Sequence, residues 1–130
     1  MSVRGVQLIA YVRDQASARA FYQRVLDRAP TLDVPGMTEF ALGDGAVLGL
    51  MPEAGIERLI GGPVAGAGIR AELYLVVDDP AAWHARALAA GATERSALQP
   101  RDWGDDVAYS VDPDGLVLAF ARRGAAPDPR

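Results

Sequence analysis

The sequence predicts an α+β protein built from two tandem β-α-β-β-β modules. Each half of the 130 residues has the same order of predicted elements. Two pairs of segments also match each other. LIAYVRD (8–14) matches LYLVVDD (73–79) at an offset of 65 residues, and GDGAVLGL (43–50) matches PDGLVLAF (113–120) at an offset of 70. Two matches in the same order, at nearly the same offset, indicate an internal duplication.

The first module begins with an alternating, β-rich segment, VQLIAYVRD (6–14), which predicts a strand. Asp14 can cap the next segment, QASARAFYQRVLDRA, whose apolar residues recur at helical spacing. A helix is therefore expected over 15–29. Turn sequences, Pro-Gly and Gly-Asp-Gly, then separate three short strands that are expected at 31–34, 38–42 and 46–51.

The second module follows a connector, residues 52–70, which contains five Gly and two Pro. A strand is expected at 71–79. Asp79 then caps a helix that has Pro80 at its first position and Gly91 after its end. Further strands are predicted at 93–98, 106–111 and 116–121. The predicted organisation is thus one domain over 1–121, with modules at 3–51 and 71–121, and a flexible tail at 122–130.

The composition limits the classes of function. A formal net charge of −4 argues against a groove that must neutralise nucleic-acid phosphates. The absence of Cys excludes disulfides, thiolate zinc sites and cysteine nucleophiles. The apolar run near the start is too short for a signal peptide or a membrane span. We therefore expect a cytoplasmic protein that binds neither nucleic acid nor membrane.

Alternation along the predicted strands divides their residues between two faces. One face is aliphatic and is expected to pack under the helices; it carries Leu8, Ala10, Val12, Leu48, Leu50, Leu73, Leu75, Val77, Leu118 and Phe120. The opposite face mixes polar, aromatic and very small residues, as a ligand cavity requires. It carries Gln7, Ile9, Tyr11, Val47, Gly49, Met51, Glu72, Tyr74, Val76, Val117, Ala119 and Ala121.

Two other features predict structure rather than chemistry. In SVDPDGLVLAF (110–120), the Pro and Gly of DPDG fit a hairpin turn, and a calcium loop would need further acceptors and a bidentate Glu. The single histidine, His84, lies in the second predicted helix beside Trp83. We expect His84 at the surface and Trp83 between helix and sheet.

Three segments of this duplicated unit resemble the vicinal oxygen chelate superfamily: AYVRDQASARAFYQRVLDRAP, LVVDDPAAWHARALAAGA and DPDGLVLAF. The resemblance covers residues 3–121. The superfamily includes glyoxalase I, extradiol dioxygenases, fosfomycin-modifying enzymes and bleomycin-resistance proteins. The resemblance implies curved mixed sheets around a shared cleft, with the helices on the outer faces. It also implies a homodimer, whose modules are exchanged between copies in some members.

The resemblance further implies four metal-ligand positions, which in metal-using members carry His or Gln, Glu, His and Glu. This chain has Gln7, Gly49, Glu72 and Ala119 there. Two of these residues have no donor atom in the side chain, and a divalent metal needs three or more ligands. We therefore expect no metal and no cofactor. The loss argues against the glyoxalase and dioxygenase reactions, which use the metal as a Lewis acid.

The favoured interpretation is a metal-free small-molecule-binding protein of the bleomycin-resistance type. It would sequester or carry a planar or cationic compound, such as an antibiotic, in space that Gly49 and Ala119 open. The expected ligand-binding residues are Gln7, Tyr11, Phe40, Gly49, Met51, Glu72, Tyr74, Trp103, Tyr109 and Ala119. A core position is an equal alternative for Phe40.

Two other functions stay open. The first is an enzyme of the same fold, with an atypical metal site or with Glu72 as general base. Apart from this candidate base, no catalytic residue is assigned. The second is a structural or regulatory dimer module without a ligand.

Overall fold

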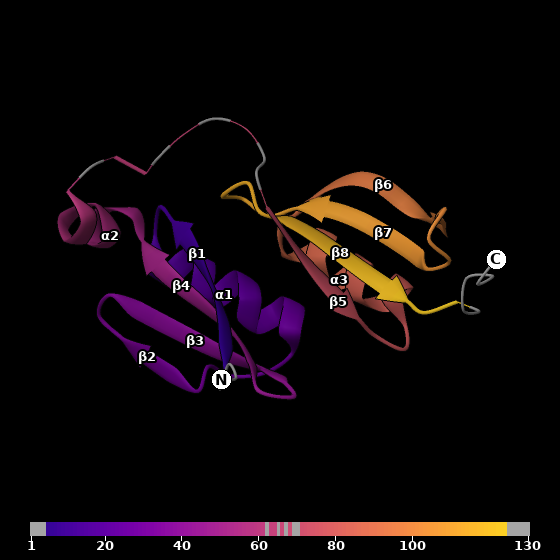
Figure 1. Cartoon of the computed structure of the whole chain (residues 1–130), viewed down its shortest axis with the longest axis horizontal. Helices are drawn as coiled ribbons and strands as arrows, with labels where there is room; N and C mark the ends of the chain where they lie inside the picture. The colour runs from indigo at the N-terminus through magenta and orange to yellow at the C-terminus, as the bar shows by residue number, and fades with distance from the viewer. Residues whose placement is uncertain (1–4, 62, 65, 67, 69–70, 125–130) are drawn as a thin grey trace, which may run out of the picture. The chain divides into compact units, whose positions relative to one another are not determined.

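The chain divides into two compact units, Met1–Ala67 and Gly68–Arg130. The computed structural model describes residues 5–61, 63–64, 66, 68 and 71–124. Each unit contains one four-stranded mixed sheet (Figure 1). The predicted α+β class is confirmed. The predicted tail from residue 125 onward, and parts of the connector, lie outside the described residues.

The first unit contains β1 (Val6–Val12), α1 (Gln15–Leu26), β2 (Leu32–Val34), β3 (Met37–Gly43), β4 (Ala46–Pro52) and α2 (Glu53–Ile60). Its strands lie in the order β1-β4-β3-β2, with β1 parallel to β4 and the other pairs antiparallel. The second unit contains β5 (Glu72–Val76), α3 (Pro80–Ala90), β6 (Thr93–Pro100), β7 (Asp106–Val111) and β8 (Val117–Arg122). Its order, β5-β8-β7-β6, repeats the first topology, so the predicted pair of β-α-β-β-β modules is confirmed.

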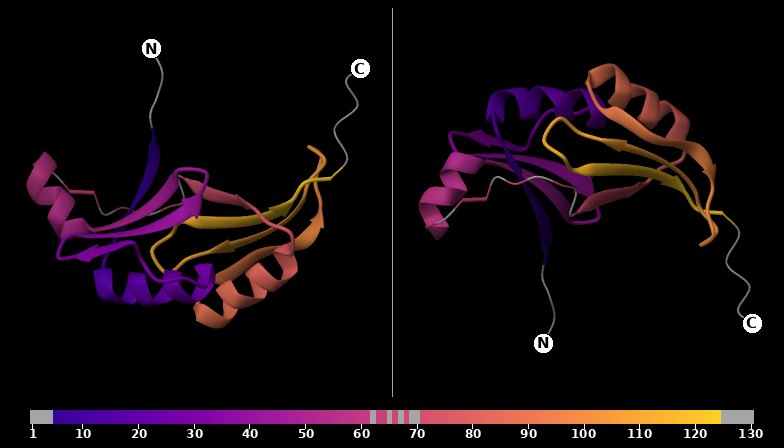
Figure 2. Two further views of the ribbon diagram at one scale, coloured as in Figure 1. Left: turned by 90° about the horizontal axis from the view of Figure 1, so that it is seen from below. Right: turned by 90° about the horizontal axis from the view of Figure 1, so that it is seen from above.

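The first helix, α1, lies against one face of its sheet (Figure 2). The Asp14 carboxylate caps it by accepting a hydrogen bond from the Ser17 N–H at 2.9 Å. The helix ends at Leu26, earlier than predicted, because Asp27 adopts a left-handed φ of 52°. Its apolar side chains are buried, as are those of the sheet's central strands: Phe21, Tyr22, Val25, Leu26, Phe40, Leu48 and Leu50.

The helix of the second unit, α3, covers one face of the other sheet (Figure 2). Asp79 caps it through the Ala82 N–H at 3.2 Å. The Trp83 ring lies 5.9 Å from the Phe120 ring, which confirms Trp83 as a helix–sheet contact. The prediction of a surface position for His84 is wrong. His84 is 7% exposed and faces Phe120, and its Nε2 lies 2.8 Å from the Glu94 carboxylate, which gives the buried imidazole a polar partner.

The connector is the largest departure from the predicted secondary structure. Its first part, Glu53–Ile60, is the helix α2, which packs against β1 and β4. Pro52 precedes this helix and Gly61 ends it with a φ of 79°, so residues that suggested a loop are the helix ends. Ile56 is buried, which anchors α2. In the described part of the chain, none of the helices has the length and apolar character needed to cross a membrane.

The DPDG segment forms the predicted turn between β7 and β8. Asp112 Oδ1 accepts hydrogen bonds from the backbone N–H groups of Asp114 and Leu116, both at 2.8 Å. Gly115 has a φ of 99°, a conformation that favours glycine. The aspartate that begins this segment therefore stabilises the turn.

Candidate functional site

Each sheet has one face toward its helix, α1 or α3, and a second face, which we call the far face. Strand register assigns the far face of the first sheet to Gln7, Ile9, Tyr11, Leu32, Val34, Met37, Glu39, Ala41, Val47, Gly49 and Met51. The far face of the second sheet carries Glu72, Tyr74, Val76, Val107, Tyr109, Val111, Val117, Ala119 and Ala121. The faces therefore divide as the alternation predicts.

A polar bridge crosses the far face of the first sheet. Gln7 on β1 donates a hydrogen bond from Nε2 to Oε2 of Glu39 on β3, at 2.7 Å. The strand β4 runs between these two strands. Since neighbouring strands lie about 4.8 Å apart, the two side chains span roughly 10 Å of sheet. Glu39 was not among the residues predicted for the site.

Gly49 makes this bridge possible, because it lies on β4 directly opposite Glu39. A Cβ atom at position 49 would lie 2.8 Å from Gln7 Nε2 and 2.5 Å from Ile9 Cδ1. Both distances are shorter than van der Waals contact, so a larger residue would displace the amide. Gly49 is itself buried. The space that the glycine was predicted to open is therefore filled by neighbouring side chains of the first unit.

Ala119 occupies the equivalent position in the second sheet, and it is also covered. It lies opposite Tyr74 on β5 and Tyr109 on β7, and it is 0% exposed. The two tyrosines pack against a cluster formed by Ala119, Ala121 and Val107. The small side chain of Ala119 therefore allows the rings of Tyr74 and Tyr109 to pack over it, and no empty volume is left there within the unit.

The far face of the second sheet carries a hydrogen-bond network centred on Tyr74. The Tyr74 hydroxyl donates to Asp105 Oδ2 at 2.6 Å and accepts from the Trp103 indole Nε1 at 2.9 Å. Asp105 is 4% exposed and also forms an ion pair with Arg123 at 2.8 Å. Trp103, held in this way, keeps 49% of its surface exposed. Arg123 lies beyond the predicted end of the domain at residue 121, so the structured part of the chain extends further.

The network shifts the pKa values of its members. Burial raises the pKa of the Tyr74 phenol, and its hydrogen bond to the Asp105 carboxylate raises it further. The same hydrogen bond, together with the nearby Arg123 guanidinium, lowers the pKa of Asp105. Tyr74 is therefore the donor and Asp105 the charged acceptor at neutral pH.

A second arginine lies against the other tyrosine. The Arg101 guanidinium is 5.1 Å from the centre of the Tyr109 ring and donates to the Val107 carbonyl at 2.8 Å. Burial raises the pKa of Tyr109, and the negative charge of Glu72 adds to this effect. Glu72 itself is exposed on the edge strand β5, whereas partial burial was expected for a candidate base.

The predicted site residues separate into three groups. Gln7, Tyr11, Gly49 and Met51 lie on the far face of the first sheet. Glu72, Tyr74, Tyr109 and Ala119 lie on the far face of the second, with Trp103 bonded to Tyr74. Phe40 lies on the other face of its sheet and is 0% exposed, so the structure contradicts its assignment as a ligand contact and favours the core alternative.

Four polar residues of these faces were missed: Glu39, Arg101, Asp105 and Arg123. The sequence did contain a signal for Glu39: alternation in TEFAL places Glu39 and Phe40 on opposite faces of the sheet, so a buried Phe40 puts Glu39 on the far face. The other three depend on contacts between a loop, a strand and the chain beyond β8, for which the sequence has no local signal.

The family model described as "Glyoxalase/Bleomycin resistance protein/Dioxygenase superfamily" matches residues 5–120. The chain belongs to this superfamily. The resemblance to vicinal oxygen chelate proteins is thereby confirmed. No curated protein sequence matches the chain.

Several solved structures share the fold of this chain. A glyoxalase-related enzyme from Fulvimarina pelagi is 21% identical, covering 93% of this chain and 89% of that one, with a TM-score of 0.79. A glyoxalase/bleomycin resistance protein/dioxygenase family enzyme from Burkholderia phytofirmans PsJN is 22% identical, covering 89% and 95%, with a TM-score of 0.80. TioX from Micromonospora sp. ML1 is 21% identical, covering 93% and 99%, with a TM-score of 0.66.

The donor set of this superfamily member does not fit the metal site that metal-using relatives have. Gly49 and Ala119 contribute no side-chain donor, and the Gln7 amide is hydrogen-bonded to Glu39. Among the residues that the structure describes, no three His, Cys, Asp or Glu side chains gather closely enough to hold a metal ion. A divalent ion at these four positions would lack the ligands it needs.

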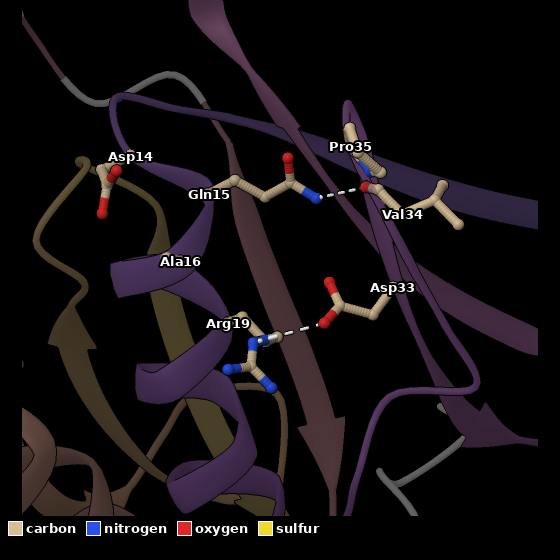
Figure 3. A pocket seen from close by; sticks show the side chains of 7 residues that line it. All are labelled: Asp14, Gln15, Ala16, Arg19, Asp33, Val34 and Pro35. Carbon is tan, nitrogen blue, oxygen red and sulfur yellow. Dashed lines mark hydrogen bonds and ion pairs between the residues drawn. The ribbon is translucent and has the colours of Figure 1, made fainter.

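A pocket of about 490 Å³ lies elsewhere, at the start of α1 (Figure 3). Its polar side chains are bonded to one another and to the backbone. Gln15 donates to the Val34 carbonyl at 2.8 Å and to Thr38 Oγ1 at 2.9 Å, and Arg19 pairs with Asp33 at 3.5 Å. These bonds hold β2 against α1, so we assign the pocket a structural role.

The Asp105 network predicts a pH dependence of stability. Because folding lowers the pKa of Asp105, its charge stabilises the fold above its unfolded pKa, about 3.9. This contribution is lost as pH falls through the lower folded value. Urea unfolding of the wild type and Asp105→Asn at several pH values should therefore show a stability difference that shrinks below about pH 4. A difference that stays constant down to pH 2.5 would contradict this role of the carboxylate.

Proposed function

We propose that this superfamily member is a metal-free small-molecule-binding protein that sequesters or carries a planar organic compound, such as an antibiotic. Binding rather than turnover is supported by the donor set, in which two of the four metal-ligand positions are Gly49 and Ala119. The observation that carries the proposal is the aromatic surface of the second unit. Tyr74 and Tyr109 pack there against Ala119, Ala121 and Val107, and the hydrogen bond from the Trp103 indole to the Tyr74 hydroxyl fixes the orientation of Trp103 beside them.

Such a surface suits a planar ligand for a physical reason. Aromatic rings stack on planar groups with a preference of about 0.5–1.5 kcal/mol beyond area burial. Rings held by hydrogen bonds lose little conformational entropy on binding, so more of that energy appears as affinity. An enzymatic role for Glu72 has less support, because its carboxylate is exposed on the edge strand β5 and is not partly buried as a general base with a raised pKa would be.

The proposal includes association of two copies. The strands β1 and β5 lie at the edges of their sheets, and an edge strand has unpaired backbone groups that favour a partner strand. Exposed apolar side chains also occur on both strands: Val6, Tyr11 and Val76. We infer a homodimer from this. Exchange of modules between its copies stays a proposal.

The test uses the full chain, treated with a chelator. A panel of planar aromatic compounds, cationic, neutral and anionic, is screened by thermal unfolding. A ligand present at 100 times its Kd should add about 2.7 kcal/mol to the free energy of unfolding. Added Zn²⁺, Ni²⁺ or Mn²⁺ should leave that affinity unchanged, and sedimentation should show a dimer.

Three results would each count against a part of the proposal. Stoichiometric metal in protein purified without a chelator would remove the metal-free assignment. Turnover of an adduct between a 2-oxo aldehyde and a thiol, with no compound of the panel bound, would replace binding by catalysis. A monomer at micromolar concentration would remove the homodimer.

A further inference from the structure

The two far faces differ in whether a carboxylate has a positively charged partner. In the second unit, the Asp105 carboxylate has an arginine partner, Arg123, at 2.8 Å. In the first unit, Glu39 accepts a hydrogen bond from the neutral amide of Gln7. Glu39 takes part in no ion pair among the residues that the structure describes. The charge of Glu39 is therefore uncompensated within that part of the molecule.

Apart from Gln7, the strand residues that share the far face with Glu39 are apolar or aromatic. It is the only charged residue among the strand residues of the far face of the first sheet, all of which the structure describes. Leu32 lies directly opposite it on β2, and Met37 lies two residues away on the same strand and face. Glu39 is half-buried there. A carboxylate next to apolar surface interacts more strongly with a cation than one surrounded by water, because the local dielectric is lower.

The Gln7 amide orients this carboxylate without neutralising it. One oxygen of Glu39, Oε2, accepts the hydrogen bond from Gln7 Nε2, which lies 2.7 Å away. The bond links β1 to β3 over Gly49, so it fixes the carboxylate in the middle of the face. Glu72, by contrast, is exposed on an edge strand, where water screens its charge.

We propose that Glu39 is the specificity-determining residue of the far face of the first sheet, and that it selects a ligand in which a positive charge adjoins a flat apolar body. The charge would lie against the Glu39 carboxylate, and the apolar body against Met37, Met51, Ile9 and Tyr11. Methionine suits this role because its flexible, polarizable side chain adapts to the shape of a ligand. This inference rests on the proposed function and names the ligand class more narrowly.

The test compares two probes of the same shape on the full chain. Thioflavin T is a planar benzothiazolium cation, and the benzothiazole that lacks its ring N-methyl group is uncharged. Titration calorimetry at low salt should show that the wild type prefers the cation about tenfold or more, as expected for a charge–charge contact next to apolar surface. Glu39→Gln should remove this preference while the affinity for the neutral probe stays the same.

Matched variants separate charge from structure. Glu53→Gln makes the same substitution in α2 of the same unit and should keep the preference. Glu39→Asp keeps the negative charge on a shorter side chain, so it should retain part of the preference for the cationic probe. If Glu39→Gln does not fold, the wild type decides the matter: its affinity for the cation, but not for the neutral probe, should fall as salt rises.

The possible outcomes distinguish this inference from the proposed function. Equal affinity for both probes, or a cation preference that survives in Glu39→Gln, overturns the role of Glu39 and leaves a planar-ligand-binding protein in place. A wild type that binds neither probe also overturns the inference, and the broader panel then decides the proposed function separately.

Discussion

Replacing Phe120 with alanine should lower the free energy of unfolding of the second unit by about 3–5 kcal/mol. Phe120 lies on β8, between β5 and β7, and is 0% exposed. Its ring lies 5.9 Å from that of Trp83 and 6.5 Å from that of His84. Truncation leaves a cavity between sheet and helix that neighbouring side chains cannot fill, because α3 and the sheet are held apart by their other contacts. Urea unfolding followed by tryptophan fluorescence measures the loss.

The control is Thr93→Ala, which truncates a side chain on β6, the other edge strand of the same sheet. Thr93 is exposed, so its truncation should change stability by about 0.5 kcal/mol or less. Equal losses for the two variants would show that burial under α3 does not determine the stability of this unit.

Replacing Trp103 with alanine should weaken binding of the planar compound that most stabilises the protein by about tenfold or more, which corresponds to about 1.4 kcal/mol. The indole is held by the Tyr74 hydroxyl at 2.9 Å and exposes half of its surface, so it is oriented and accessible at once. Titration calorimetry with the wild type and the variant measures the change.

Two comparisons make this result specific. Trp103→Phe keeps an aromatic ring but loses the indole N–H, so it should bind with an intermediate affinity. Trp103→Ala should lower the free energy of unfolding by less than about 1.4 kcal/mol, the expected loss of binding free energy, because half of the side chain is exposed. Unchanged affinity in Trp103→Ala would exclude Trp103 from the ligand contact.

The repeat explains why small residues at equivalent positions of the two sheets have the same consequence. Gly49 faces Glu39 on the neighbouring strand, and Ala119 faces Tyr109 at the corresponding position. In both sheets, the small residue on β4 or β8 lets side chains from the strands on either side approach each other. A small residue at these positions thus does not leave a gap. Side chains of the neighbouring strands occupy the space beside it, and in the first sheet they bring the Glu39 carboxylate to the face.

The strands illustrate what alternation can and cannot predict. Alternation of side chains along each strand correctly separated residues that face the helix, such as Leu48, from residues of the far face, such as Gly49. It could not reveal that Gln7 reaches Glu39, because that contact depends on which strands are neighbours and in what register. The same limit applied to the buried His84, whose partner, Glu94, comes from another element, β6.

The duplicated β-α-β-β-β architecture and the two faces of each sheet can be predicted from the sequence alone. Both follow from local periodicity, capping residues and turn residues, which act within a few positions of the chain. The superfamily was indicated differently, by the resemblance of three segments to known proteins, and the family model over residues 5–120 shows it. The side chains that fill the space beside Gly49 and Ala119, and the carboxylates that have a cationic partner, become visible only in the folded structure. Such contacts join residues far apart in the chain, for example Gln7 with Glu39, 32 positions apart, and Trp103 with Tyr74, 29 positions apart. Strand register and loop packing therefore decide them.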